Sequence, residues 1–148
     1  MKKAIIIGAS SGIGKGISLE LLKKDYKIAI SARREDRLNE IKQVNPENVI
    51  VKVFDSSTEK NDILLDYFIN KLDGVDLIIY CSGIGILNKE LDYKIERKVN
   101  DLNVSGFTQV ITYAYNYFLK MGSGHIVNIS SIASSHFLRF QFRLSLLI

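Results

Sequence analysis

The segment KAIIIGASSGIGKG, residues 3–16, decides the fold class of this 148-residue chain. Its apolar run at 4–7 predicts a buried strand, and glycines at positions 8, 12 and 14 lead from that strand into a helical pattern. In a strand–turn–helix unit, such a turn brings backbone amides and the positive end of the helix dipole to a pyrophosphate. We interpret it as a dinucleotide-binding turn, and not as a glycine turn without a ligand, with the following contacting residues: Gly8, Ser10, Gly12, Ile13 and Gly14.

Apolar blocks alternate with longer helical patterns along the rest of the chain. We expect strands at residues 3–7, 27–32, 49–54, 76–80 and 125–130, and helices at 13–24, 35–44, 59–72 and 93–120. Ser57 or Thr58 would cap the third helix. Continuous apolar strands separated by helices predict a parallel sheet covered on both faces, and right-handed crossovers favour the strand order 3-2-1-4-5. The predicted fold class is therefore α/β, a Rossmann-type doubly wound parallel sheet truncated after its fifth strand.

Composition excludes several other classes of protein. With 47% hydrophobic and 24% charged residues, the chain has the composition of a soluble globular domain. Cys81 and two distant histidines offer no metal-ligand spacing, and one cysteine cannot form an internal disulfide. The apolar runs are too short for an export signal or a membrane span, so we expect a cytoplasmic protein. The net charge of +4 is scattered through helical segments, which favours solvated helix faces over nucleic-acid binding.

The glycine spacing G-x-x-x-G-x-G in GASSGIG resembles that of the short-chain dehydrogenases/reductases. The resemblance covers residues 1 to about 135, which we predict to be one dinucleotide-binding Rossmann domain. It implies an NAD(P)-dependent oxidoreductase that transfers a hydride between nicotinamide and a small carbonyl compound or secondary alcohol. It leaves the oligomeric state open, since relatives usually assemble through the long helix and the one that should follow it.

The end of the second strand, SARR at residues 31–34, bears on the choice of cofactor. An acidic residue at this place would bind the ribose 2′-hydroxyl, whereas an arginine accommodates a 2′-phosphate. The NAD-preferring members of the family carry their acid where this chain has Ala32, and Arg33 follows at once. We therefore expect NADP(H) in preference to NAD(H). The alternative is that Arg33 and Arg34 only begin a solvated helix.

Two further segments match the cofactor side of the family. Asp55 corresponds to the aspartate that holds the adenine amino group, with Ser56 beside it, although a turn or helix-capping aspartate is the alternative. The segment YCSG, residues 80–83, aligns with the Asn-Asn-Ala-Gly of the family. Its residues that would pass close to the cofactor ribose are Cys81, Ser82 and Gly83. We interpret Cys81 as a small buried filler and not as a reactive thiol.

At the reacting end, Asn103 in DLNVSGF matches the helix asparagine that supports a water in the proton relay of the family. Ser131, 28 residues later, matches the serine that binds the substrate carbonyl or hydroxyl. The alternatives are an exposed helical asparagine and a hydroxyl that satisfies backbone groups at a strand end.

The family pattern Tyr-x-x-x-Lys, which supplies the proton, is absent from this sequence. Leu144 and Ile148 stand where the tyrosine and lysine should be, and neither side chain can exchange a proton. Residues 136–148 form an atypical tail in which apolar and polar residues alternate with the period of a strand. We expect a truncated or frame-shifted chain end and impaired catalysis. The alternatives to a working NADP(H)-dependent oxidoreductase are a non-catalytic dinucleotide-binding module and a degenerate fragment.

Overall fold

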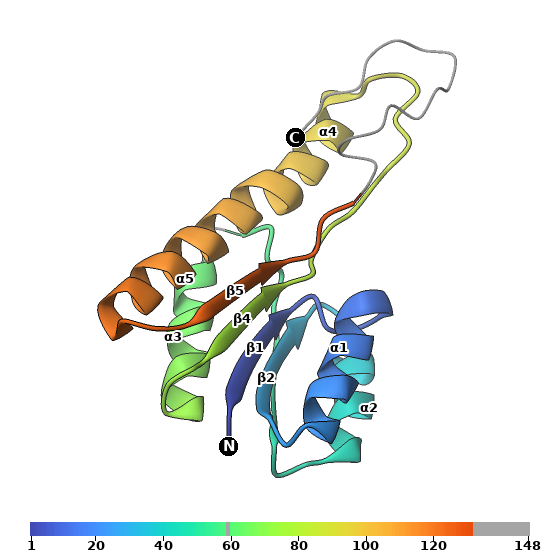
Figure 1. Cartoon of the computed structure of the whole chain (residues 1–148). Helices are drawn as coiled ribbons and strands as arrows, with labels where there is room; N and C mark the ends of the chain where they lie inside the picture. The colour runs from blue at the N-terminus through green and yellow to red at the C-terminus, as the bar shows by residue number, and fades with distance from the viewer. Residues whose placement is uncertain (59, 132–148) are drawn as a thin grey trace.

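A parallel five-stranded sheet lies at the centre of the molecule in the computed structural model, which describes residues 1–58 and 60–131 (Figure 1). The strands are β1 Lys3–Ile7, β2 Lys27–Ala32, β3 Val49–Val53, β4 Leu77–Tyr80 and β5 His125–Asn128. They follow the order β3-β2-β1-β4-β5, and every pairing of neighbours is parallel. The predicted α/β class and the predicted strand order are both confirmed.

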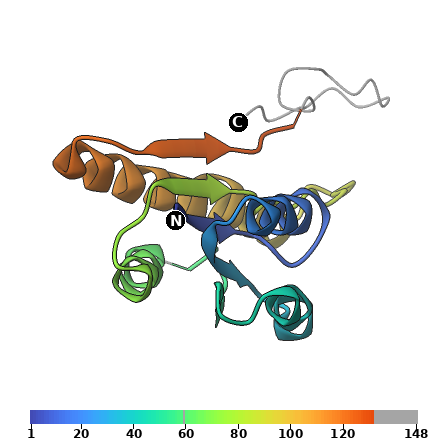
Figure 2. The same cartoon turned by 60° about the horizontal axis from the view of Figure 1, so that its bottom comes forward.

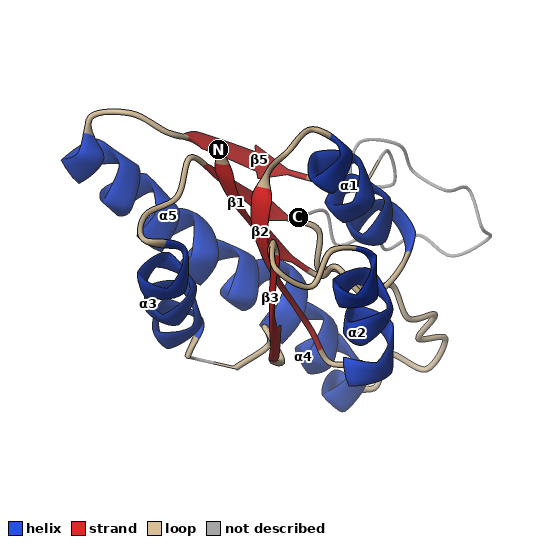
Figure 3. Cartoon of the chain, turned by 90° about the horizontal axis from the view of Figure 1, so that it is seen from below, coloured by secondary structure: helices blue, strands red, loops and turns tan. Residues whose placement is uncertain are grey.

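The helices lie on both faces of this sheet. They are α1 Gly12–Lys23, α2 Glu35–Val44, α3 Asn61–Leu72, α4 Tyr93–Asn100, the π-helical segment η1 Asp101–Gly106 and α5 Phe107–Met121. Helices α1 and α2 cover one face, and α3 and α5 cover the other, so the molecule has three layers (Figures 2 and 3). This is the arrangement that right-handed crossovers between parallel strands produce.

The apolar run of β1 is explained by its central place in the sheet. Successive side chains of a strand point to opposite faces. Ile5 and Ile7 pack in the core formed with α3 and α5, whereas Ala4 and Ile6 pack in the core formed with α1 and α2. All four are fully buried. A strand that is buried on both faces needs an unbroken apolar sequence, and the segment 4–7 provides one.

The start of α3 differs from the prediction. The helix begins at Asn61 after Lys60, and the N-cap position has no side-chain hydrogen bond. Ser57 does not cap the helix because its backbone N–H and its hydroxyl both donate to Asp55 Oδ1, at 3.0 and 2.8 Å. The predicted capping role of Ser57 or Thr58 is therefore wrong. The N-cap residue is Lys60, and Ser57 belongs to a turn that precedes the helix in the chain.

One continuous helical run extends from Tyr93 to Met121, close to the predicted 93–120 (Figure 1). The wider turn of η1 in its middle was not predicted. At Gly106, the last residue of η1, an added Cβ would lie 2.1 Å from the carbonyl oxygen of Ser56. The backbone of the helix therefore comes directly against the loop that follows β3.

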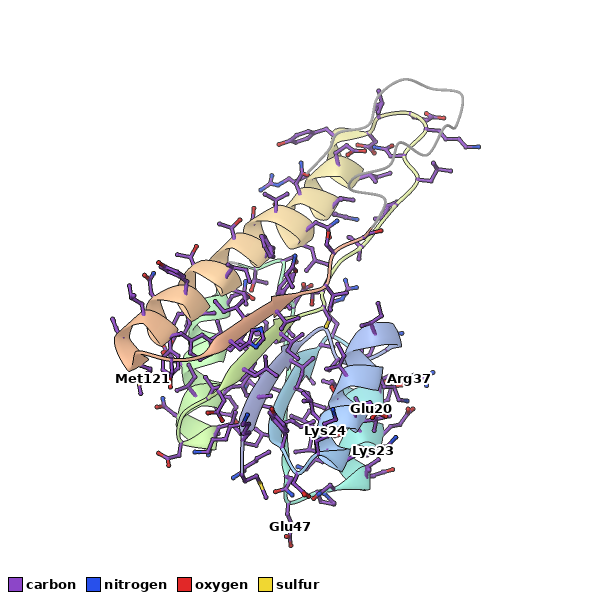
Figure 4. All side chains as sticks on the ribbon, viewed as in Figure 1. Glu20, Lys23, Lys24, Arg37, Glu47 and Met121 are labelled. Carbon is purple, nitrogen blue, oxygen red and sulfur yellow. The ribbon has the colours of Figure 1, made fainter. Side chains whose placement is uncertain are left out.

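The charged side chains lie mainly on the outer faces of the helices. Figure 4 labels Glu20 and Lys23 on α1, Lys24 directly after it and Arg37 on α2. Surface ion pairs such as Lys23–Glu20, at 2.7 Å, occur on these faces, in agreement with the predicted solvated faces. Within the described ranges, no helix combines the length and apolar character needed to cross a bilayer. The predicted boundary at 135 and the tail 136–148 lie outside the described residues.

Candidate functional site

A cavity of about 380 Å³ opens beyond the carboxyl ends of the central strands. It lies where the strand order reverses between β1 and β4, which is the position at which doubly wound sheets bind their ligands. Four segments line it, one at the end of each of the first four strands: Gly8, Ser10, Ser11; Ala32, Arg33, Arg34; Phe54, Asp55, Ser56; and Cys81, Ser82, Gly83, Ile84, with Leu102 from η1.

At two of its glycines, Gly8 and Gly14, the turn after β1 is packed too tightly for any larger residue. Gly8 has φ +91°, and an added Cβ there would lie 2.7 Å from the backbone nitrogen of Ser82. At Gly14 an added Cβ would lie 2.3 Å from the carbonyl oxygen of Gly8. The turn is tied to β2 because Gly8 N–H and Ala9 N–H both donate to the Ser31 carbonyl, at 2.8 and 3.1 Å. These contacts place the start of α1 against the end of β1.

The amino terminus of α1 is open toward an anion. Its N-cap residue, Ser11, forms no side-chain capping hydrogen bond, and its first turn contains no acidic residue. A Cβ at Gly12 would meet nothing within 4 Å, and Ile13 is 61% exposed. The first N–H groups of a helix lack partners inside the helix and carry the positive end of its dipole. A phosphate group supplies the acceptors and the charge that complement them.

Arg34 lies across the glycine turn, a contact that the sequence did not predict. Its Nη2 donates to Ser11 Oγ at 2.6 Å and to Ser10 Oγ at 3.0 Å. Arg33 lines the same cavity from the adjacent position. No carboxylate among residues 1–58 and 60–131 forms an ion pair with either arginine. Two guanidinium groups without an ion-pair partner among the described residues therefore stand beyond the end of β2.

Asp55 and Ser56 bring the loop after β3 into the cavity. The carboxylate of Asp55 accepts both hydrogen bonds from Ser57, so it closes a turn while it faces the cavity. Asn61 stabilises this loop, because its Nδ2 donates to the carbonyls of Ser56 and Thr58 at 3.1 and 2.9 Å. Asn61 is fully buried, so these bonds replace contacts with water that the loop carbonyls would otherwise make.

The segment after β4 divides its side chains between the core and the cavity. Tyr80 is buried in the core on the α3 and α5 side, and its hydroxyl donates to the Leu102 carbonyl at 2.9 Å. Cys81 is half-buried, lines the cavity and packs against the other core. Burial raises the pKa of the Cys81 thiol to about 11, so the thiol is protonated at neutral pH. This agrees with the interpretation of Cys81 as a filler.

Asn103 and Ser131, the two predicted reacting residues, do not line the cavity in the described part of the chain. Asn103 is exposed in η1 beside it, where Oδ1 accepts from Ile84 N–H at 2.9 Å and Nδ2 donates to the Ile84 carbonyl at 2.8 Å. Ser131 is exposed and follows the end of β5, the neighbour of β4 in the sheet. Leu144 and Ile148 lie outside the described residues.

Eight of the predicted cofactor residues line the cavity: Gly8, Ser10, Arg33, Asp55, Ser56, Cys81, Ser82 and Gly83. Gly12, Ile13 and Gly14 lie at the start of α1, next to the glycine turn. The sequence did not identify Ser11, Phe54, Ile84 and Leu102 as cavity residues, and it considered Arg34 only as part of a solvated helix. The sequence could have pointed to Ser11 and Arg34 as site residues, because each directly follows a predicted cofactor residue.

The fold and this cavity define a class: a Rossmann-type protein with a dinucleotide-binding turn at the switch point of its sheet. A family model described as short chain dehydrogenase matches residues 2–141. The chain belongs to the short-chain dehydrogenase family.

Similar proteins agree with this assignment. An uncharacterized oxidoreductase of Staphylococcus epidermidis is 33% identical over 135 residues, which cover 89% of this chain and 59% of that protein. The solved structure of ElxO with NADP bound has a TM-score of 0.83 at 27% identity and covers 93% of this chain and 58% of its own. A short-chain dehydrogenase/reductase of Mycobacterium ulcerans has a TM-score of 0.85 at 25% identity, with coverages of 93% and 54%. The chain thus spans 59% of the length of the Staphylococcus relative.

Proposed function

We propose that this chain binds NADP(H), and that its chemistry is hydride transfer between the nicotinamide and a small carbonyl compound or secondary alcohol. The observation that carries the proposal is the pair Arg33 and Arg34 beyond the end of β2, where Ala32 leaves no acid to bind a ribose hydroxyl. Guanidinium groups bind phosphate through charge-assisted hydrogen bonds. The bound NADP in the ElxO structure supports this choice of cofactor.

The residues around the cavity fit the successive parts of such a cofactor. The amides at the start of α1 would hold the pyrophosphate, and the arginines with Ser10 and Ser11 would hold the 2′-phosphate. Asp55 and Ser56 would contact the adenine from the loop after β3. Ser82 and Gly83 would lie along the ribose that carries the nicotinamide. When bound, the nicotinamide supplies or accepts the hydride.

The reacting end would consist of Ser131, which would bind the substrate oxygen, and Asn103, which would help to hold the proton-relay water. At positions 144 and 148 the chain has Leu144 and Ile148, neither of which exchanges a proton. Reduction of a carbonyl needs a proton as well as a hydride. We therefore propose that this chain binds the cofactor but catalyses hydride transfer only weakly. The specific observation of Leu144 and Ile148 therefore favours a second candidate function, a non-catalytic dinucleotide-binding module.

Titration of the purified chain with NADPH and with NADH, followed by nucleotide fluorescence, tests the cofactor proposal. We expect NADPH to bind more tightly because only NADPH carries the phosphate that the arginines would contact. Equal affinities for the two nucleotides would contradict this choice of cofactor. Steady NADPH oxidation with aldehydes, ketones or quinones would contradict the proposed weak turnover and support the catalytic function over the binding module.

A further inference from the structure

The segment 81–84 is tied to two consecutive residues of η1. Directly before the segment, the hydroxyl of Tyr80 donates to the Leu102 carbonyl at 2.9 Å. At its end, the side-chain amide of Asn103 bonds to both the N–H and the carbonyl of Ile84, at 2.9 and 2.8 Å. The segment, whose four residues all line the cavity, is thus tied to the helix on both sides.

The hydrogen bond between the Tyr80 hydroxyl and the Leu102 carbonyl joins two buried residues. Tyr80 is 2% exposed and Leu102 is 7% exposed. The Tyr80 ring meets the Phe107 ring edge-on, with centroids 5.7 Å apart. Burial, together with the charge of Asp55, raises the pKa of Tyr80 above its ordinary value, so the hydroxyl remains a donor at neutral pH. Loss of this donor would remove a hydrogen bond from a buried place in the fold.

A displacement of segment 81–84 would act directly on the cavity. The backbone of Ser82 lies so close to the glycine turn that a single carbon added to Gly8 would approach its nitrogen to 2.7 Å. Cys81, Ser82 and Gly83 face the cavity from this segment. The segment therefore has little room to move without changing the surface beside the glycine turn.

We propose that Tyr80 is a positioning residue for the cofactor site. Its hydroxyl holds η1 against the end of β4, and η1 in turn holds Ile84 through Asn103. A tyrosine stands here in place of the asparagine of the family pattern, and it reaches across to the helix. The proposal rests on the proposed function, because segment 81–84 matters to binding only if the cavity takes NADP(H).

Tyr80→Phe tests this role with a matched control, Tyr113→Phe. Tyr113 also has a hydroxyl bond, to Asp66, but it joins α5 to α3 and does not line the cavity. Amide hydrogen exchange at Ile84 is measured by NMR without any nucleotide. We expect roughly tenfold faster exchange at Ile84 in Tyr80→Phe and an unchanged rate in Tyr113→Phe. NADPH affinity should fall about fivefold in Tyr80→Phe alone.

Unchanged exchange at Ile84 in Tyr80→Phe would overturn the proposal. Equal acceleration in both variants would also overturn it, because that result indicates general loosening of the fold. Failure of the unaltered chain to bind NADPH would refute the proposed function, while the exchange rates would still decide the positioning role. If Tyr80→Phe does not fold, Tyr80→Met, which also removes the hydroxyl and fills the space with a flexible apolar side chain, is judged by the same two criteria.

Discussion

The two ends of the candidate site are built in different ways. On the adenosine side, the glycine turn, the arginines and Asp55 each follow directly from a strand of the β1–β2–β3 half of the sheet. On the reacting side, Asn103 comes from the middle of a long helix and Ser131 from beyond β5, the edge strand among the described residues. Local strand–turn–helix units thus place the residues of the first region, apart from the Arg34 contact with Ser10 and Ser11, whereas the second depends on contacts between distant segments.

Gly14→Ala would break the adenosine side most severely. The added Cβ would lie 2.3 Å from the Gly8 carbonyl, so the turn or the helix must move. We expect a loss of about 3 kcal/mol in the free energy of unfolding and no detectable NADPH binding. Urea denaturation and fluorescence titration measure the two effects. Gly16→Ala is the control, because a Cβ there would meet nothing within 4 Å, and it should leave binding intact.

The reactivity of Cys81 measures how well the cavity wall after β4 shields this thiol. Its pKa of about 11 implies that iodoacetamide reacts with it at pH 8 roughly a hundredfold more slowly than with an unperturbed thiol. The rate should rise as the pH approaches 11, because a larger fraction of the thiol ionises. Mass spectrometry of the alkylated chain measures this rate. Fast labelling at pH 8 in the folded chain would mean that the cavity wall is open.

Arg34→Ala should weaken NADPH binding roughly tenfold while NADH binding stays constant, because only the 2′-phosphate loses a charged partner. Parallel titrations with the two nucleotides give the ratio of affinities. Arg37→Ala is the matched control: Arg37 lies in α2, three residues after Arg34, and pairs with Glu40 at 3.1 Å outside the cavity. A similar loss in the Arg37 variant would indicate long-range attraction and not contact.

Asn103→Ala tests how much the reacting side contributes to cofactor binding. It removes both hydrogen bonds to Ile84 and should lower NADPH affinity about fivefold, with a small loss of thermal stability. Calorimetry and thermal denaturation measure the two quantities. Asn70→Ala, on the exposed surface of α3, is the control and should change neither. If affinity is unaffected in Asn103→Ala, the helix does not support the segment after β4.

Ser131→Ala should have the smallest effect on cofactor binding. Because Ser131 does not line the described cavity, we expect NADPH affinity to stay within about twofold of the unaltered chain. Fluorescence titration is again the measurement. A larger loss would show that the segment beyond β5 also contributes to cofactor binding, in contradiction to its place outside the described cavity.

The predictability of the site follows the same division, with Arg34 as the exception on the adenosine side. The turn after β1 was predicted because its glycines, its strand and its helix are adjacent in the sequence. Arg34 was missed as a site residue because its contact with Ser10 and Ser11 crosses from β2 to β1. The π-helical turn of η1 was missed because the apolar spacing of residues 93–120 is that of an ordinary helix, and the third helix was given the wrong cap because Ser57 bonds to Asp55 instead.

The sequence by itself determined the fold class, the strand order and the place of the glycine turn, because apolar periodicity and glycine spacing are properties of neighbouring residues. Only the tertiary structure decided that Tyr80 meets Leu102, that Asn103 holds Ile84 and that Arg34 lies over the turn. Each of these bonds joins groups from different elements. Their geometry therefore depends on how the helices pack against the sheet, and that packing is set by shape and burial across the whole domain.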